Sequence, residues 1–456
     1  MQLPAGPRIP LLATLQWIAN PVAFMEACAK EYGDIFTAPL GKNFHPFLFV
    51  SNPEALQEIL TAGSDRFDAP GEANEVLRPL LGQDGLMLVS GDRHRRQRQL
   101  LMPPFHGERM RAYDRLIGEI TEQVISQWTP GSPFSVRKSM QAISLRVILS
   151  AVFGIHRGQR YEQLEQLLGA MLETLSFPWS ASLLFFRFLQ RDLGPLSPWA
   201  RFQRRQEEID RLIYAEIQER REQLDPSRTD ILTLLMTARD EAGEPMTDLE
   251  LHDELITLLV AGHETTASTL TWALYWIHKL PPVREALLQE LDLLGDEPDA
   301  NAISRLPYLN AVCAETLRIY PIAMLTFPRV VRSPLSLMGY NLEPGTIVTG
   351  CIYLTHHRED LYPQANLFKP ERFLERQFSP YEYLPFGGGS RRCIGLAFAM
   401  FEMKLVLAKI LSRWQLAIAD GYAVKPVRRG VTLAPTEGNW LIATSQRQKA
   451  NIPVLL

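Results

Sequence analysis

The sequence predicts a mostly α-helical protein organised around one long helix. Residues 109–224 have the pattern of successive helices, separated by breaks such as Pro130-Gly131-Ser132-Pro133. A capping box follows at Thr247 and Glu250, where the threonine oxygen can accept from a helical amide while the glutamate reaches back. The helix that starts there can continue to Leu280, because a proline pair stops it only at the next position. At about 1.5 Å per residue, this helix would be roughly 50 Å long.

The N-terminal part of the chain mixes short helices with extended segments. Asn20-Pro21 is typical of a helix start, and Phe24 and Cys28 would share one side of that helix. Phe47–Val50 is aromatic and apolar and leads into an Asn-Pro turn, which predicts a strand followed by a helix. Residues 68–89 are rich in Gly, Pro and Leu but lack periodicity, so we expect an irregular loop there.

Polar residues interrupt the apolar middle of the long helix at Ala261-Gly262-His263-Glu264-Thr265. Glycine inside a helix costs about 1 kcal/mol relative to alanine, and threonine hydroxyls can divert carbonyls from the helical ladder. A local opening of the helix at a functional cavity explains this combination better than packing does. The alternative is a satisfied polar patch between packed helices, and we expect His263 to be a structural histidine.

A second unusual stretch is the glycine-rich loop from Phe386 to Gly395, which carries Cys393. Consecutive glycines allow positive φ angles and close approach of the backbone. Arg391, Arg392 and the start of a following helix all favour a thiolate over a thiol at Cys393. Such a thiolate can be a nucleophile, a metal ligand or half of a disulfide. No second Cys or His lies at zinc-ligand spacing, so a zinc site is poorly supported.

This loop resembles the Phe-x-x-Gly-x-Arg-x-Cys-x-Gly signature of the cytochrome P450 superfamily, the haem-thiolate monooxygenases. All five fixed positions match, at Phe386, Gly389, Arg391, Cys393 and Gly395. The alternative is a glycine-rich surface turn beside a buried cysteine. The resemblance spans nearly the whole chain, and the remaining motifs support it.

The resemblance implies one cytochrome P450 haem domain over residues 1–456, mostly α with a small β-rich lobe and a long central distal helix over the haem. It implies b-type haem with Cys393 as the axial ligand, since no Cys-x-x-Cys-His is present for covalent attachment. Dioxygen would be the co-substrate. Glu264 and Thr265 match the family's catalytic acid–alcohol pair, while Ala261 and Gly262 would leave room for dioxygen. Phe386, Gly387 and Gly395 would shape the cofactor-binding loop.

The resemblance also implies residues that hold the haem edge and stabilise the cysteine loop. His94 and Arg98 are four residues apart, hence on one helical face, and would contact the propionates, although relatives usually carry tryptophan at the His94 position. Arg329 and Arg391 would supply further propionate contacts. A structural triad that locks the loop is expected from three residues: Glu315, Arg318 and Arg372.

The expected substrate pocket is largely apolar. It is assigned from the family to eight positions: Leu86, Val89, Leu258, Ala261, Ile322, Leu325, Phe327 and Gly438. We therefore expect a hydrophobic small-molecule substrate such as a fatty acid, terpenoid or steroid. The apolar, aromatic residues 168–188 can be either core or the roof of this pocket.

Composition excludes some classes of protein and partner. A formal net charge of −4 argues against nucleic-acid binding. The four cysteines are sparse and unpatterned, which suits a reducing cytoplasm. Prolines and polar residues break the N-terminal apolar run, so we expect no transmembrane segment. A minor alternative is contact with a membrane surface through five apolar residues: Leu11, Leu12, Leu15, Trp17 and Ile18. A soluble, monomeric protein of bacterial type is the expectation.

The chain after Cys393 is too short for a flavin or ferredoxin domain, so we expect electrons from a separate ferredoxin or flavodoxin with its reductase. The resemblance places the basic run Arg93, Arg95 and Arg96 on the docking face, with Arg392 and Lys404, and opposite charge speeds encounter with an acidic partner. Three alternatives stay open: a hydroperoxide-using peroxygenase or isomerase of the same fold, a haem-based binder without turnover, and a non-haem helical protein with a chance motif.

Overall fold

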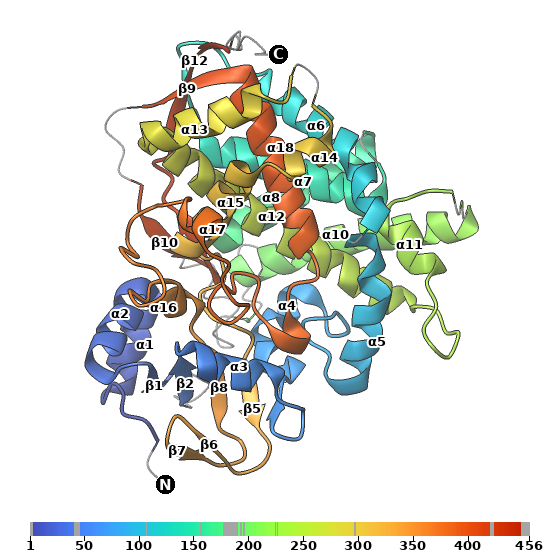
Figure 1. Cartoon of the computed structure of the whole chain (residues 1–456). Coiled ribbons are helices and arrows are strands. Elements are labelled where there is room, and N and C mark those ends of the chain that lie inside the picture. The colour runs from blue at the N-terminus through green and yellow to red at the C-terminus, as the bar shows by residue number, and fades with distance from the viewer. Residues whose placement is uncertain are drawn as a thin grey trace. The chain divides into compact units, whose positions relative to one another are not determined.

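The structure is a computed structural model that describes residues 3–40, 46–105, 107–155, 157–176, 190–191, 194, 197–223, 225, 227–295, 298–419 and 424–447. It divides into two compact units, each assembled from separate stretches of chain (Figure 1). The first unit comprises Met1–Ala73, Ala314–Cys393 and Pro426–Ala434, and the second comprises Asn74–Cys313, Ile394–Lys425 and Pro435–Leu456. The expectation of a single domain over the whole chain stays a prediction.

The first unit contains the larger sheet. Its five strands lie in the order β1-β2-β8-β5-β3, in which β2 and β8 are parallel and the other pairs are antiparallel. Leu48 and Val348, from the parallel pair, are fully buried in the core beneath this sheet. The strand expected at Phe47–Val50 is confirmed as β2. The strands and hairpins of this unit are β1 (Ile35–Ala38), β2 (Phe47–Val50), β3 (Phe67–Asp68), β5 (Arg329–Val331), β6 (Leu335–Leu337), β7 (Tyr340–Leu342), β8 (Ile347–Gly350) and β10 (Pro426–Arg429), which pairs with β11 (Thr432–Pro435).

Short helices surround this sheet. The helix expected after Asn20 is confirmed, and the Asn20 side chain caps it by accepting from the Ala23 amide at 3.1 Å. Phe24 and Cys28 are buried, as expected. The helices of this unit are α1 (Pro10–Ala19), α2 (Pro21–Tyr32), α3 (Pro53–Thr61), α16 (Ile352–His356), α17 (Arg372–Glu375) and the 3₁₀ turn η6 (Gly389–Arg391), while α15 (Pro307–Ile319) begins in the second unit and ends in the first.

The second unit is a set of helices with one small antiparallel sheet, ordered β4-β12-β9. The succession of helices expected within residues 109–224 is confirmed over the residues described there, whereas residues 177–188 of the apolar stretch lie outside the described residues. The segment expected to be an irregular loop contains two short helical turns instead. The elements are η2 (Gly71–Leu77), which straddles the unit boundary, α4 (Arg78–Leu81), α5 (Gly91–Leu101), η3 (Pro103–Phe105), η4 (Gly107–Arg111), α6 (Ala112–Ile125), β4 (Pro133–Ser135), α7 (Val136–Phe153), α8 (Gln159–Ser176), α10 (Pro198–Glu222), α11 (Ile231–Thr237), α12 (Asp248–Lys279), α13 (Pro281–Asp292), α14 (Ala300–Ser304), α18 (Leu396–Arg413), β9 (Trp414–Ile418) and β12 (Trp440–Gln446).

The long helix is α12, and its capping box is formed as expected. The Glu250 amide donates to Thr247 Oγ1 at 3.2 Å, and the Thr247 amide donates to Glu250 Oε2 at 2.9 Å. The helix runs without interruption to Lys279, so the expected local opening at residues 261–265 is wrong. Ser144 of α7 instead donates to the carbonyls of Gly262 and His263 at 3.1 and 3.0 Å, so the polar stretch is stabilised within an intact helix.

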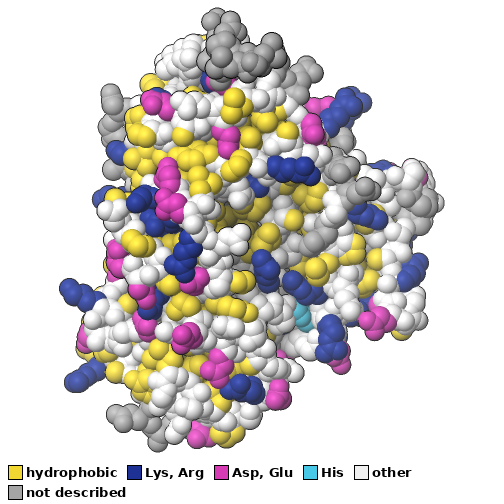
Figure 2. Space-filling model, in the orientation of Figure 1, with side chains coloured by type: hydrophobic (Ala, Val, Ile, Leu, Met, Phe, Trp, Pro, Cys, Tyr) yellow, Lys and Arg dark blue, Asp and Glu magenta, His cyan; other side chains and the backbone are white. Residues whose placement is uncertain are grey.

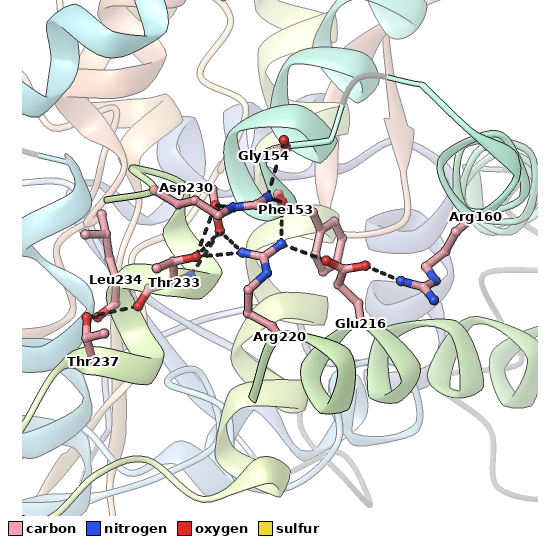
Figure 3. A network of polar contacts seen from close by, with 10 residues as sticks. Phe153, Gly154, Arg160, Glu216, Arg220, Asp230, Thr233, Leu234 and Thr237 are labelled. Atoms are coloured by element: carbon pink, nitrogen blue, oxygen red, sulfur yellow. Dashed lines mark hydrogen bonds and ion pairs between the residues drawn. The ribbon is translucent and has the colours of Figure 1, made fainter. Parts of the chain in front are cut away.

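A buried ionic network joins α10 to the start of α11 (Figure 3). Arg220 is 4% exposed and donates to Glu216 at 2.7 Å, to Asp230 at 2.8 Å and to the Phe153 carbonyl at 3.0 Å. Asp230 in turn caps α11 by accepting from the Thr233 amide. Because buried charges are costly without partners, this complete set of partners is what makes a buried arginine tolerable.

Candidate active site

The cysteine loop belongs to the first unit and is closed by a backbone hydrogen bond from Cys393 to the Phe386 carbonyl at 3.0 Å. Gly387 and Gly389 both have φ of 66°, a region that side-chain-bearing residues seldom adopt. A Cβ on Gly389 would also lie 2.5 Å from the Leu60 carbonyl oxygen of α3. The glycines therefore let the loop turn tightly, as the sequence predicts, and the structure shows that the loop packs closely against α3. Gly395 has φ of −84° and is the N-cap residue of α18, so its role differs.

Cys393 differs from the other cysteines of the chain because its side chain is exposed. Cys28, Cys313 and Cys351 are buried, and all four are free thiols. Burial raises the pKa of Cys313 and of Cys351 to about 12, so these two thiols stay protonated. A thiolate ligand has to be deprotonated and accessible, which leaves Cys393 as the suitable cysteine.

Two arginines lie beside this loop. Arg329 is 3% exposed and donates to the Gly388 and Phe327 carbonyls at 3.1 and 2.8 Å. Burial lowers the pKa of its guanidinium to about 10, and among the described residues no carboxylate lies within ion-pair distance of it. Arg391 donates to the Ala69 carbonyl at 2.6 Å, and its guanidinium lies 4.4 Å from the centroid of the Phe327 ring. Of these two arginines, Arg329 is the buried one, and its hydrogen bonds go to backbone carbonyls. Its guanidinium is therefore suited to bind the carboxylate of a ligand.

The expected triad is brought together by the structure. Arg318 forms a fork with Glu315 at 2.6 and 2.8 Å, and Arg372 reaches the same carboxylate at 3.2 Å. All three side chains are buried, and the Glu315 carboxylate also accepts from the Lys369 amide at 2.8 Å. Arg318 donates in addition to the His356 carbonyl at 2.7 Å. The triad thus fastens residues 356–372, which precede the cysteine loop in the chain, to α15.

In the second unit, α12 exposes one place in an otherwise buried stretch. Ala261 is exposed and Thr265 is half-buried, whereas residues 251–259 and 266–274 are all buried. Thr265 Oγ1 donates to the Ala261 carbonyl at 2.6 Å. A Cβ on Gly262 would lie 3.0 Å from the Ile148 side chain of α7. Its missing side chain permits close packing of two helices, and the expectation that it makes room for dioxygen stays a prediction.

Glu264 is held by side chains that the sequence did not single out. Arg137 of α7 forms an ion pair with it at 2.8 Å, and Gln141 and Ser268 each donate to its carboxylate at 3.2 Å. Arg137 carries no sequence signal for this role because it is far away along the chain. The neighbouring His263 is 2% exposed, and burial lowers its pKa to about 4, so it is neutral. Its Nδ1 has no hydrogen-bond partner among the described residues, so the expected hydrogen bonding of His263 is not met at this atom, while its structural role stays a prediction.

The basic helix expected around His94 is α5. His94 is buried and Arg98 is half-buried. Arg96 is occupied by Asp240 and Glu250, with nitrogen–oxygen distances of 2.5 and 2.8 Å, whereas Arg93 and Arg95 remain largely exposed. The basic run is therefore divided between a structural ion pair and two surface charges.

The residues expected to line the substrate pocket fall in both units. Leu86, Val89, Leu258, Ala261 and Gly438 belong to the second unit, and Ile322, Leu325 and Phe327 belong to the first. Leu86, Val89, Leu258 and Ile322 are buried, and the remainder except Ala261 are half-buried. That they share one cavity stays a prediction.

The donor set fits haem held through a cysteine. An accessible sulfur lies on a glycine-rich loop, and the buried guanidinium of Arg329 beside that loop, which has no ion-pair partner among the described residues, suits a propionate. Haem iron needs one such sulfur, whereas no group of three or more His, Cys, Asp or Glu side chains able to hold a metal ion occurs in the described part of the chain. These features define a haem-thiolate protein.

A family model described as Cytochrome P450 matches residues 4–442, and the chain belongs to this family. It is therefore a cytochrome P450 monooxygenase, an oxidoreductase that uses b-type haem with a cysteine thiolate ligand and dioxygen. The fold prediction, mostly α with a small β-rich part, is confirmed. Among the described residues, no helix is both long and apolar enough to cross a membrane.

Similar proteins come from bacteria. The chain is 37% identical to putative cytochrome P450 135B1 of Mycobacterium tuberculosis, over 96% of this chain and 90% of that protein. It is 32% identical to putative cytochrome P450 135A1 of the same species, over 98% and 96%. Among solved structures, the retinoic acid-bound cyanobacterial CYP120A1 is 26% identical with a TM-score of 0.83, covering 97% of this chain and 99% of that one. The cytochrome P450DA haem domain, 24% identical with a TM-score of 0.85 over 98% of both chains, shares the fold.

Proposed function

We propose that the protein inserts one atom of dioxygen into a C–H or C=C bond of a hydrophobic small molecule, with Cys393 as the axial ligand and electrons from a separate ferredoxin or flavodoxin. The observation that carries the proposal is the exposed Cys393 on its closed glycine loop. The bound haem would supply the activation of dioxygen. Arg329 and Arg391 would bind its propionates from beside the cysteine loop, and His94 and Arg98 would do so from α5.

Proton management falls to Glu264 and Thr265. The Thr265 hydroxyl donates to the Ala261 carbonyl, and rotation about χ1 would free it to hold a water molecule above the exposed Ala261. Glu264 forms an ion pair with Arg137, so it would have to leave that partner to carry a proton. The retained acid and alcohol support a monooxygenase over a peroxygenase or isomerase, whose members typically lack this pair.

The first experiment tests the axial ligand. We expect the reduced, carbon-monoxide-treated protein to show the spectral shift of thiolate-bound haem, and Cys393→Ala to abolish it. Cys28→Ala is the matched control, because Cys28 is a buried free thiol elsewhere in the same unit and should leave the spectrum unchanged. Retention of the shift in Cys393→Ala would refute the assignment.

The substrate class rests on the apolar character of the expected pocket residues, and a similar protein, CYP120A1, was solved with retinoic acid bound. A spectral titration against fatty acids, terpenes and steroids would measure displacement of water from the ferric iron. Substrate-dependent consumption of NADPH with redox partners, together with an oxygenated product, would support the monooxygenase. Turnover on hydroperoxide alone would instead indicate a peroxygenase.

Electron delivery is proposed to use Arg93 and Arg95, whose side chains are 60% and 73% exposed. Lys and Arg side chains gather on the surface around α5 (Figure 2). Arg96 and Lys404 are less available, because Arg96 pairs with two carboxylates and Lys404 donates to the Ser304 carbonyl at 2.9 Å. The double variant Arg93→Glu/Arg95→Glu should slow reduction by an acidic ferredoxin at low salt, while Arg115→Glu, 90% exposed on α6, should not. Equal reduction rates in all three proteins would refute this docking face.

The protein is further proposed to act as a monomer in the cytoplasm, since its four cysteines are free thiols and suit a reducing compartment. Sedimentation of the holoprotein tests the first point.

A further inference from the structure

Helix α1 presents an apolar face to its surroundings. Leu11, Leu12, Leu15 and Ile18 are 60%, 49%, 54% and 38% exposed, and Ile9 just before the helix is 61% exposed. At 100° per residue, the four helical positions fall within one third of the helix circumference. The helix contains no charged residue. A surface helix of a globular protein normally turns its apolar stripe inward and its charges outward, whereas the outward face of α1 is apolar and uncharged.

The exposed side chains are held by a firmly anchored helix. On the opposite face, Ala13 is 1% exposed, and the Trp17 ring packs edge-on against Phe24 and Phe49 with centroid distances of 5.9 and 5.7 Å. Thr14 donates to the Pro39 carbonyl at 3.2 Å. The backbone of α1 is therefore fixed to the first unit, and its leucines cannot turn inward.

A second apolar group adjoins this helix. Val431, in the turn between β10 and β11, is 51% exposed. Arg428 ties this turn to α1: it donates to the Gly430 carbonyl at 2.8 Å and to the Trp17 carbonyl at 3.4 Å, and its guanidinium lies 5.6 Å from the Trp17 ring centroid. The turn is thus fixed to α1 on the side of Trp17, and the exposed aliphatic side chains in and just before α1 form what we call the α1 surface: Ile9, Leu11, Leu12, Leu15 and Ile18.

We infer that the α1 surface inserts into the interfacial region of a lipid bilayer, with α1 lying parallel to the membrane plane. The five residues in and just before α1 present on the order of 450 Å² together, well below the roughly 800 Å² per partner that a stable dimer buries. Helix α1 itself carries no charged side chain that could orient a protein partner, and the Thr14 hydroxyl is already bonded within the unit. The apolar, uncharged face of α1 is compatible with the acyl-chain region of a bilayer, where interfacial helices bury their apolar face.

Insertion of an apolar surface and electrostatic attraction to anionic lipids place different requirements on the bilayer. Binding driven by buried apolar area does not need negative headgroups and is insensitive to salt, whereas attraction between exposed charges weakens within a Debye length as salt rises. Binding to zwitterionic vesicles at high salt is therefore the diagnostic condition.

The test is flotation of the haem-loaded full chain with vesicles of pure phosphatidylcholine and of phosphatidylcholine with 30% phosphatidylglycerol, each at low and high salt. We expect the protein to float equally in all four conditions, and Leu11→Asp/Leu15→Asp to lower the partition coefficient at least tenfold. Leu293→Asp is the matched control, because Leu293 is 75% exposed on another surface and should not change binding. The carbon monoxide spectrum of each variant verifies that the site is intact.

Four outcomes would overturn the inference. The protein would remain with the soluble fraction in every condition, or the double variant would float as the native protein does. Alternatively, flotation would require phosphatidylglycerol and disappear at high salt, which would indicate surface charge in place of apolar insertion. A dimer in sedimentation analysis that dissociates in Leu11→Asp/Leu15→Asp would assign the α1 surface to a second copy of the chain.

Discussion

Removing the guanidinium of Arg137 leaves the Glu264 carboxylate in α12 without a cation. Among the described residues, Arg137 is the one cation within ion-pair distance of Glu264, at 2.8 Å, and the two side chains are 5% and 13% exposed. Breaking a buried ion pair from one side typically costs 3–5 kcal/mol, because an uncompensated charge stays behind. Gln141 and Ser268 still donate to the carboxylate, so we expect Arg137→Met to lower the free energy of unfolding by about 3 kcal/mol.

A double-mutant cycle separates this cause from simple loss of packing. In Arg137→Met/Glu264→Gln no charge remains, so we expect the double variant to recover at least 1.5 kcal/mol of the loss. Urea unfolding of the holoprotein, followed by haem absorbance and by circular dichroism, measures each free energy. The control is Arg115→Met, which breaks the exposed pair of Arg115 with Glu119 and should change stability by less than about 0.5 kcal/mol. A double variant no more stable than Arg137→Met would refute the argument.

Three further predictions follow from buried groups and from the cysteine loop. Burial raises the pKa of Glu254 to about 8, so the folded protein holds this proton more tightly than the unfolded chain; the contribution to stability is present below pH 4.5 and is lost as pH rises to 8. Glu254→Gln should therefore gain stability relative to the native protein by up to about 4 kcal/mol between pH 5 and pH 8, and a constant difference in urea melts across this range would contradict it. Arg220→Met removes the cation that Glu216 and Asp230 share, while Arg160 and Arg228 still pair with these carboxylates, so it should cost about 1.5–3 kcal/mol in the same melts; a loss below about 1 kcal/mol would show that the network contributes little. Gly389→Ala places a Cβ 2.5 Å from the Leu60 carbonyl oxygen and should weaken haem retention during gel filtration. The control is Gly387→Ala, where φ is also 66° but a Cβ would have no neighbour within 4 Å, so this variant should lose clearly less haem. Equal losses of haem in the two variants would refute the steric argument.

Features encoded by short spacings could be predicted from the sequence. The capping box at Thr247 and Glu250, the start of α2 after Asn20 and the fork between Glu315 and Arg318 all join residues within about one helical turn. The positive φ angles of Gly387 and Gly389 could also be predicted, because glycine adopts this conformation without the steric penalty that a side chain imposes. The family signature around Cys393 is equally local, and through the family resemblance it predicted the fold and the cofactor.

Contacts across long stretches of chain could not be predicted. Nothing near Arg137 indicates that it meets Glu264, and nothing near Gly262 indicates that its missing side chain admits Ile148. The expected opening of α12 was wrong because Ser144, on a different helix, satisfies the carbonyls beside Gly262. Likewise, Arg96 belongs by sequence to a basic run, but Asp240 and Glu250 occupy it in the fold.

The sequence by itself determined where the long helix begins and ends and which residues are proposed as haem ligand, acid and alcohol, since each depends on residue type and near-neighbour spacing. Only the tertiary structure decided which partners neutralise the buried charges and which apolar side chains stay exposed. The physical reason is that the pairing of a buried charge and the burial of a leucine depend on what the rest of the chain brings beside them. The outward face of α1 is an example: its leucines have the composition of a core, and the anchoring of Ala13 and Trp17 on the opposite side turns them to the surface.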